Sequence, residues 1–438
     1  MTPELIGILM IAGLIAGILV GFPIAFTMIF LGTAFGYWGF GKLVFYLLTL
    51  QFYGTMMETT LTSIPLFVLM GMLLERANLV DRLFAVLQQL LARVRGALYL
   101  AVMLVATILA AATGIVGASV TLLGIMAGKQ MVRAGYDTRL SAGLITAGGT
   151  LGILLPPSVM LIVMGPIIEV PVTTLFVAAI VPGLLLATVF TGYALLRSWI
   201  DPTLAPRPPP VEAGDVGSLW MALARGLLPL VAILLASLGS IVAGLATPTE
   251  GAACGALGAL VLTVAYRRFS LAMLRDALVR TLEISVLILF LIAASNFFGA
   301  VFSRLGTPGM LSEALLALEL NRYLLLAAML ALIFVLGWPL EWVPIVLIVV
   351  PFLLPLATQL GFDRTWFGIL VAVNLQTAWL SPPVALSAYF LKSVVPEWEL
   401  DDIYRGMAQF MGLQLLVLAL LVAFPGIVLW LPRLLYGS

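Results

Sequence analysis

Histidine is absent from this chain, cysteine occurs once, and charged residues make up only 9% of its 438 residues. The lack of histidine removes the commonest general base and metal ligand of proteins. The single cysteine, Cys254, excludes a disulfide within the chain and lies in a small-residue stretch, GAACGALGAL, that suits close helix packing. A net charge of +1 gives no basic surface, so we expect no nucleic-acid partner.

The scarcity of charge also decides the fold class. Soluble domains carry about a quarter charged residues, whereas this chain is 63% hydrophobic. Apolar stretches long enough to span a lipid bilayer recur from Leu5 to Leu431. The first, Leu5 to Leu31, is too long for a signal peptide and lacks a basic region before it, so we interpret it as the first span. The sequence therefore predicts an all-α polytopic membrane protein.

Arginine and lysine orient the predicted spans, because cytoplasmic loops carry an excess of both. Three basic residues from Lys129 to Arg139 place that stretch in the cytoplasm, and the proline-rich segment 200–219 becomes a cytoplasmic linker. Segments 76–95 and 269–280 are expected to lie along the inner surface as amphipathic helices. In this threading, the basic residues on the periplasmic side are Arg304, Arg322, Arg364 and Arg433. Both termini come out periplasmic.

Two apolar segments do not fit as single spans. Residues 97–128 have basic residues at both ends, and TGIVGAS in the middle holds Gly114 and Gly117, which can supply a turn. Arms of about 15 residues are about 22 Å long, shorter than the roughly 30 Å hydrocarbon core. Residues 323–360 repeat the pattern, with LGWPLEW in the middle. We expect two re-entrant hairpins; for residues 97–128 the alternative is one tilted helix.

Each expected hairpin is followed by an apolar segment that a proline pair interrupts. GGTLGILLPPSVML lies within the expected helix 140–168, and NLQTAWLSPPVALSAYF lies within the expected helix 366–391. The first hairpin enters the membrane from inside, whereas the second enters from outside. The sequence therefore predicts two inverted repeats, residues 1–199 and 220–438, of a transporter whose site lies near the bilayer midplane.

The proline pairs have a chemical consequence. Proline has no N–H, so Pro156 and Pro157 free carbonyls one turn earlier. Such backbone survives at membrane depth only if it is buried in protein or lines a cavity. Freed carbonyls suit a small hard cation such as Na⁺, and helix N-termini suit a carboxylate. The alternative is a proline kink that serves packing alone.

The motifs, taken in order, resemble one family. GFPIAFTM, IPLFVLMGMLLE, GASVTLLGIMAG, SAGLITAGGTLGILLPPS and NLQTAWLSPP are similar to the large membrane subunit of a TRAP (tripartite ATP-independent periplasmic) transporter, DctM-like, in the ion transporter superfamily. The resemblance covers essentially the whole chain. It implies sodium-driven uptake of a small organic acid (a C4-dicarboxylate, keto acid or sugar acid) across the bacterial inner membrane.

The resemblance also implies partners and a mechanism. The partners are a periplasmic substrate-binding protein (DctP-like) and a separate small four-helix membrane subunit (DctQ-like). The hairpins and broken helices form an elevator domain, which carries the site past a fixed scaffold. No catalytic residue and no cofactor are implied, and Na⁺ is the coupling ion.

Two positions depart from the family pattern. Ala118 stands where the family often has a serine before Ser119, and Glu341 stands where it usually has aspartate. The breaks and the resemblance together predict Na⁺ bound through backbone carbonyls and hydroxyls near Ser119–Thr150 and near Gly337–Thr377. The candidate sodium- and substrate-binding residues are Gly114, Gly117, Ser119, Gly149, Thr150, Gly152, Pro156, Pro157, Ser158, Gly337, Glu341, Asn374, Gln376, Thr377, Ser381, Pro382 and Pro383.

Glu341 is the acidic residue deep in the second expected hairpin. Because burying a carboxylate is costly, we expect it either to serve the site or to cap backbone N–H groups at the turn. Arg304, at the end of a span, is a candidate for contact with a substrate carboxylate or for pairing with Glu341; the alternative is an interfacial anchor. Asn374 and Gln376 are expected to line a cavity, since polar side chains at membrane depth avoid lipid.

Other functions are weighed against this interpretation. An enzyme is not expected, because Ser158 has no histidine or nearby lysine to activate it. Trp338 and Trp342 are expected to pack the hairpin and not to stack on substrate. The alternative transporter is a stand-alone sodium-coupled carboxylate symporter of the same superfamily that needs no binding protein. Neighbouring genes for a secreted binding protein and a small four-span protein would favour the TRAP interpretation.

Overall fold

Helices make up all of the regular structure in the part of the chain that is described. The computed structural model describes residues 2–77, 79–91, 94–114, 116–206, 216–317, 319–338, 340–382 and 385–437, and no strand occurs among them. Within these ranges seven helices are long and apolar enough to cross a membrane, and an eighth span is added if a bent helix pair counts as one. The predicted all-α polytopic membrane fold is therefore confirmed.

Before residue 201, the described residues form fourteen short and long helical elements. They are α1 (Pro3–Val20), α2 (Ile24–Phe40), α3 (Leu43–Met57), η1 (Thr59–Thr62), α4 (Ser63–Arg76), α5 (Leu79–Leu91), α6 (Ala97–Thr113), α7 (Val116–Leu123), η2 (Gly124–Gly128), α8 (Lys129–Arg133), α9 (Thr138–Thr150), η3 (Leu151–Ile153), α10 (Val159–Ile168) and α11 (Val172–Ile200).

The remaining elements begin with a short 3₁₀ turn after α11. They are η4 (Pro202–Leu204), α12 (Val216–Leu234), η5 (Leu235–Gly239), α13 (Ser240–Val242), α14 (Pro248–Ala265), α15 (Leu271–Arg304), α16 (Thr307–Leu316), α17 (Arg322–Leu336), α18 (Trp342–Pro344), η6 (Ile345–Val349), α19 (Val350–Gln359), α20 (Arg364–Leu380), α21 (Leu386–Val394), α22 (Leu400–Ala423) and α23 (Gly426–Tyr436).

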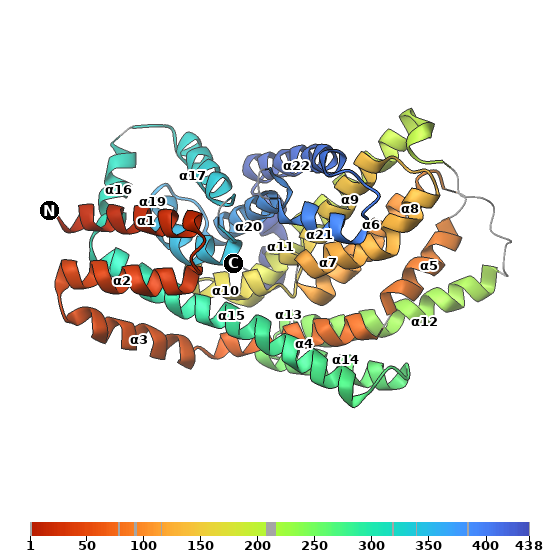
Figure 1. Cartoon of the computed structure of the whole chain (residues 1–438), viewed down its shortest axis with the longest axis horizontal. Helices are drawn as coiled ribbons and strands as arrows, with labels where there is room; N and C mark the ends of the chain where they lie inside the picture. The colour runs from red at the N-terminus through yellow and green to blue at the C-terminus, as the bar shows by residue number, and fades with distance from the viewer. Residues whose placement is uncertain are drawn as a thin grey trace.

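The elements fall into two groups that lie side by side. Helix α15 runs along one group, packing against α2 and α3 toward one end and against α4 toward the other, where α14 packs on α4 (Figure 1). The second group contains α6, α7, α9, α20, α21 and α22. Its closest helix crossing is between α9 and α22, where Gly143 and Gly406 face each other and a Cβ on either would overlap the partner backbone. Small residues at this crossing let two apolar helices approach closely.

Both segments that do not fit as single spans are helical hairpins. In the first, the Tyr99 ring near the start of α6 packs edge-on against Tyr136, just after α8, with ring centroids 4.9 Å apart. In the second, Tyr323 at the start of α17 packs against Phe362, just after α19, at 6.0 Å. Because the two ends of each segment meet, neither segment is a single tilted helix. The turns fall at Gly114, whose φ is +63°, and between α17, which ends at Leu336, and α18, which begins at Trp342.

The same local structure follows each hairpin, 226 residues apart. Gly135 and Gly361 both take a positive φ at the end of the second arm, a conformation that glycine adopts without strain. Asp137 then caps α9 by accepting the N–H of Leu140, and Asp363 caps α20 by accepting the N–H of Trp366. Both second arms also contain a π turn, η2 and η6. The two halves therefore build their hairpin and following helix in the same way.

Two expectations about the remaining segments are wrong. Residues 269–280 were expected to form a separate surface helix, but they are continuous with the following span in α15, which begins after the Ser270 cap. The linker 200–219 is shorter than expected, because α12 already begins at Val216. Residues 207–215 of it lie outside the described residues.

The start of the linker is held against the first hairpin. The Tyr99 hydroxyl and the Asp137 N–H both donate to the carbonyl of Leu204. Hydrogen bonds from the hydroxyl and N–H of Thr203 hold the pKa of the Asp201 carboxyl below its usual range. This part of the linker therefore belongs to the surface of the second helix group.

Candidate functional site

The first break, residues 151–158, interrupts the helix formed by α9 and α10. The helix narrows to the 3₁₀ turn η3 after Thr150 and resumes at Val159, with the Pro156–Pro157 peptide bond cis. The Ser158 hydroxyl donates to the Ile153 carbonyl at 2.5 Å and accepts the N–H of Leu161 at 3.4 Å. Ser158 is therefore the N-cap of α10 and also bridges the break.

The tip of the first hairpin lies against this break. A Cβ placed on Gly114 would be 3.4 Å from the carbonyl oxygen of Pro157 and 3.9 Å from that of Gly152. Carbonyl oxygens of the break therefore lie close to the hairpin turn. The candidates Gly114, Gly152 and Pro157, which lie in different elements, are brought together in space.

Two adjacent glycines of α9 explain how the hairpin fits so closely. A Cβ on Gly148 would be 3.0 Å from the Ala106 side chain of α6, and a Cβ on Gly149 would overlap Val120 of α7. The pair is thus held between the two arms. Ser119 and Thr150, next to this contact, are 2% and 0% exposed. The first predicted cluster is closed off from the surroundings.

Gly117 of the first hairpin has a different partner from the other candidates. A Cβ there would be 3.0 Å from the Phe390 ring of α21, and Gly124 lies as tightly against Leu391 and Val394 of the same helix. Gly117 therefore serves contact between the first hairpin and the second half of the chain, not the first break.

The second break, residues 381–385, separates α20 from α21. Pro382 is exposed, whereas Pro383 lies outside the described residues. The second hairpin is held beside the break by two hydrogen bonds, from Trp338 Nε1 to Ser381 Oγ at 3.1 Å and from Asn374 Nδ2 to the Leu330 carbonyl at 2.7 Å. Gly337 fits closely against Ala378, since a Cβ there would be 2.8 Å from the alanine Cβ.

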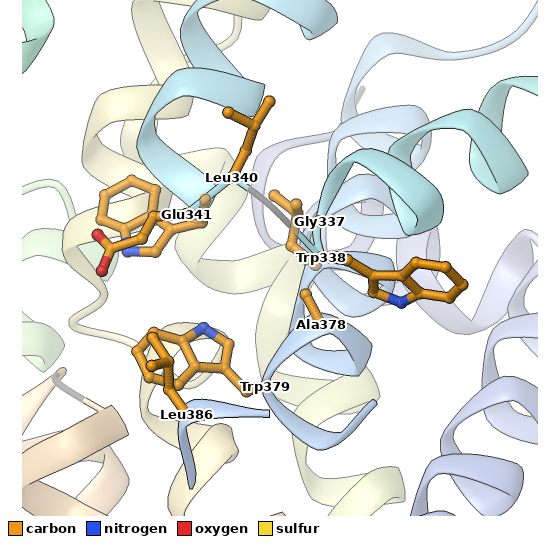
Figure 2. Close-up of a pocket in the computed structure, with 9 residues that line it drawn as sticks. Gly337, Trp338, Leu340, Glu341, Ala378, Trp379 and Leu386 are labelled. Carbon is orange, nitrogen blue, oxygen red and sulfur yellow. The ribbon is translucent and has the colours of Figure 1, made fainter. Parts of the chain in front are cut away.

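A small cavity of about 90 Å³, which we call the tip cavity, opens between the second hairpin and the second break. Figure 2 shows Glu341 on one side, Trp379 and Leu386 across from it, and Trp338 pointing away. The cavity is lined by Gly337, Trp338, Leu340, Glu341, Trp342, Leu375, Ala378, Trp379 and Leu386. Glu341 stands at the N-cap of α18 but makes no side-chain cap hydrogen bond. The capping role is therefore wrong, and the carboxylate belongs to the cavity.

Three other candidates lie elsewhere or are otherwise engaged. Gln376 accepts a hydrogen bond from Gln414 of α22 at 3.2 Å, inside the protein and away from the tip cavity. Thr377 donates to the Asn374 carbonyl one turn before it, at 2.5 Å. Arg304 is exposed, and its guanidinium lies over the Phe40 ring, 5.4 Å from the ring centroid. Arg304 and Glu341 are both among the described residues, and they form no ion pair with each other. Arg304 is thus placed as an anchor at the end of α15.

Gln414, which is buried, and Glu58, which is half-buried, are polar residues that the sequence reasoning missed. Gln414 is fully buried and donates to the Val373 carbonyl at 3.0 Å. Glu58 lies at the bend between α3 and α4. The available signal for Glu58 was an acidic residue between two apolar segments, in GTMMETTLTS, but it lacks the proline pair that identified the breaks.

The sequence matches one protein family along most of its length. The family model described as "Tripartite ATP-independent periplasmic transporter, DctM component" matches residues 11–427. The chain is 30% identical over 387 residues to the C4-dicarboxylate TRAP transporter large permease protein DctM of Pseudomonas aeruginosa, covering 88% of this chain and 89% of that protein. It is 30% identical over 390 residues to the sialic acid TRAP transporter large permease protein SiaM of Vibrio cholerae, with the same coverage.

A solved structure supports the fold separately. The YdaH transporter of Alcanivorax borkumensis, whose crystal structure is described as having an unusual topology, superposes with a TM-score of 0.63 over 89% of this chain and 90% of that one. The sequences are 17% identical, so the likeness concerns the fold alone.

Proposed function

Because this chain belongs to the family of DctM components of tripartite ATP-independent periplasmic transporters, we propose that it couples the uptake of a small organic acid to the inward flow of Na⁺. As a large permease it is a transport protein and not an enzyme. The observation that carries the sodium proposal is the approach of Gly114 to the carbonyls of Gly152 and Pro157. Carbonyl oxygens gathered at a buried break suit a hard monovalent cation.

Each break supports one proposed Na⁺ site. At the first, near Ser119–Thr150, the ligands are carbonyls of the break and hydroxyls beside the Gly149 contact. At the second, near Gly337–Thr377, the tip cavity brings the Glu341 carboxylate to the same region. The residues of the first region are buried, whereas the second region contains the tip cavity. This difference supports two separable ion sites.

The proposed substrate is an organic acid of the kind that its relatives' names print, a C4-dicarboxylate or sialic acid. The described residues that line the tip cavity include no arginine or lysine. A carboxylate substrate is therefore met by helix N-termini and by hydrogen-bond donors such as the indoles of Trp342 and Trp379. We assign most selectivity to a periplasmic binding protein. A keto acid or sugar acid fits the same description.

The proposed assembly follows from the tripartite family. We propose a DctP-like binding protein and a small four-helix DctQ-like subunit as partners, in the bacterial inner membrane. Membership in a tripartite family weighs against a stand-alone symporter. The two inverted repeats, 1–199 and 220–438, are supported by the hairpin and cap structures that recur 226 residues apart. We propose that hairpins and broken helices move as an elevator domain.

The orientation of the chain is part of this proposal. Both termini are proposed to be periplasmic. The Thr307 hydroxyl donates to the Glu4 carbonyl and the Tyr436 hydroxyl donates to the Val242 carbonyl. Since residues 242 and 307 are periplasmic in the proposed threading, these contacts agree with it.

The proposal is tested by uptake into proteoliposomes that hold the large and small subunits, with the binding protein outside. An inward Na⁺ gradient should drive accumulation of a labelled organic acid that the binding protein holds. Equal accumulation on a proton gradient, with Na⁺ absent, would contradict sodium coupling. A binding protein that holds only neutral sugars or cations would contradict the substrate class.

A further inference from the structure

A second cavity lies between α3 and α15 of the first helix group and α10, which packs against α20 of the second group. It has a volume of about 130 Å³ and we call it the interface cavity. Helices α3 and α15 form one wall, and α10 and η6 form the other. The cavity is lined by Gln51, Gly54, Thr55, Glu58, Leu61, Val163, Pro166, Ile167, Ile292, Asn296 and Leu347.

The polar groups of the interface cavity are concentrated on one wall. Gln51, Thr55 and Glu58 are spaced at four and three residues, which places them on one face of a helical chain. Asn296 of α15 joins them by donating from Nδ2 to Thr55 Oγ1 at 3.0 Å. Because the amide nitrogen faces Thr55, the amide oxygen of Asn296 is left as an acceptor. The wall therefore offers several side-chain oxygens.

Glu58 contributes the charge of this wall. One carboxylate oxygen, Oε1, accepts the N–H of Thr60 at 3.2 Å, and among the described residues the other oxygen has no hydrogen-bond partner and no ion pair. The residue stands at the 55° bend of α3 and α4, a helix pair that together is apolar and long enough to cross a membrane. Glu58 is half-buried, and a carboxylate among apolar spans is costly unless a positive charge or a proton accompanies it.

The opposite wall is apolar. It is formed by Val163, Pro166 and Ile167 of α10 and by Leu347 of η6. No lysine or arginine is among the described lining residues. At about 30 Å³ for each water molecule, the cavity holds about four waters, which is room for a partly hydrated small ion.

From these observations we propose that the interface cavity binds one monovalent alkali cation. The Glu58 carboxylate neutralises it, and the oxygens of Asn296, Thr55 and Gln51 complete the shell with water. One carboxylate balances a single positive charge, whereas Ca²⁺ sites gather several acidic oxygens. The site is distinct from the two proposed break sites. Because the ion lies between the α3–α15 wall and the α10–η6 wall, its binding stabilises the arrangement of the two helix groups seen here.

The test is cation binding to the full-length large subunit purified with its small subunit. Binding of ²²Na⁺ and of ⁸⁶Rb⁺, as a probe for K⁺, is measured at constant ionic strength with N-methyl-D-glucamine as the inert cation. Glu58→Gln should bind one alkali cation fewer than the parent protein. The control, Glu397→Gln, removes an exposed carboxylate and should bind as many as the parent. The tracer that is lost identifies the ion.

Two further variants keep the proposal testable if Glu58→Gln does not fold. Thr55→Val and Asn296→Ala retain the carboxylate and should weaken the same ion by about tenfold or more, as loss of a ligand or its support does at metal sites. In a Pro156→Ala/Pro157→Ala background the Glu58-dependent ion should still bind, so failure of the break sites is told apart from failure of this one. Unchanged stoichiometry and affinity in Glu58→Gln would overturn the proposal. So would wild-type binding in both the Thr55 and the Asn296 variants.

Discussion

Trp338 illustrates how one side chain couples a hairpin to a break. Its indole N–H reaches Ser381 at the end of α20, while Glu341, three residues later, faces the tip cavity (Figure 2). The two residues of the same turn therefore have separate tasks, one in holding the hairpin and one in lining the cavity. Sequence reasoning assigned Trp338 to packing, which leaves out its polar role.

Trp338→Phe should remove this hydrogen bond while keeping most of the apolar contact. We expect a loss of about 1 kcal/mol of stability, the usual net value of one hydrogen bond. The measurement is reversible denaturant unfolding in detergent. Trp342→Phe is the control, because Trp342 lines the same cavity without a polar partner among the described residues. Ser381→Ala should match Trp338→Phe, and the double variant should add little; additive losses would show that the two groups act independently.

Polar residues near the breaks were predictable from the sequence, but their directions were not. Successive residues of an α-helix point about 100° apart, since there are about 3.6 residues per turn. Asn374 therefore faces the hairpin helix α17, whereas Gln376, two positions later, faces Gln414 of α22. Which face meets the cavity depends on how α20 is packed, and the sequence of α20 does not contain that information.

The broken helices are the elements on which the proposed ion sites depend. Pro156 and Pro157 are buried in a segment where the helical ladder stops for several residues. The hairpin tip approaches the carbonyl oxygens of Gly152 and Pro157 in this segment. A break of this kind differs from the prolines inside α10 and α11, around which the helix continues.

Pro156→Ala/Pro157→Ala should raise the sodium concentration that gives half-maximal uptake. Alanine favours helix by roughly 3 kcal/mol for each proline replaced, so the ladder closes and withdraws carbonyls from the ion. Pro382→Ala/Pro383→Ala should affect a second, separable component. Pro182→Ala, within the continuous helix α11, is the control and should leave sodium dependence unchanged. Uptake is compared at equal amounts of folded protein. Lower stability with normal sodium dependence in both double variants would indicate a packing kink instead.

At the element scale, helix breaks were more predictable than helix continuity. Proline and glycine mark the breaks directly, because each has a backbone requirement of its own. The charges of Arg275, Asp276 and Arg280 suggested a surface helix separate from the following span, yet no proline lies between Leu271 and Arg304 to end it. A helix continues where no proline interrupts it. The exposed charged residues in the first turns of α15 therefore mark the start of the apolar part of the helix and not a helix end.

The whole molecule is organised by pairs of features that recur in the two halves. An ion pair joins Arg139, at the start of α9, to Asp402 of α22 at 2.8 Å. Another joins Arg364, at the start of α20, to Glu169, just before α11. Each pair connects one half of the chain to the other at corresponding helix starts. Exposed pairs of this kind contribute little energy singly, so their value here is to show the correspondence.

Single-cysteine labelling should reveal opposite orientations of the two hairpins. In a Cys254→Ser background, cysteines at Val94 and Arg133 should react with a membrane-impermeant maleimide only from the cytoplasmic side. Cysteines at Arg322 and Gln359 should react only from the periplasmic side. All four positions are exposed and flank a hairpin. Labelling of the two ends of one hairpin from opposite sides would contradict the re-entrant path, and labelling of both hairpins from one side would contradict inverted repeats.

Two similar halves could be predicted from the sequence, because charged residues and prolines can be located without a structure, and their inverted orientation stays a prediction. The basic residues around 97–128 and the 226-residue interval between proline pairs were enough to propose two similar halves. The contact of the first hairpin with α21 was not predictable. It joins residues more than 250 positions apart through glycines whose partners, Phe390, Leu391 and Val394, carry no distinguishing pattern.

The contact between the first hairpin and α21 can form only late in the synthesis of the protein. Gly117 and Gly124 reach the ribosome exit long before the α21 side chains that cover them. At about 5–20 residues per second, the roughly 270 intervening residues take about 14–54 s to synthesise. During that interval the inserted first hairpin has its glycine face open to lipid or to the insertion machinery. The first hairpin therefore cannot form its contact with α21 until α21 has been synthesised. The transporter acquires its final packing only when translation is almost complete.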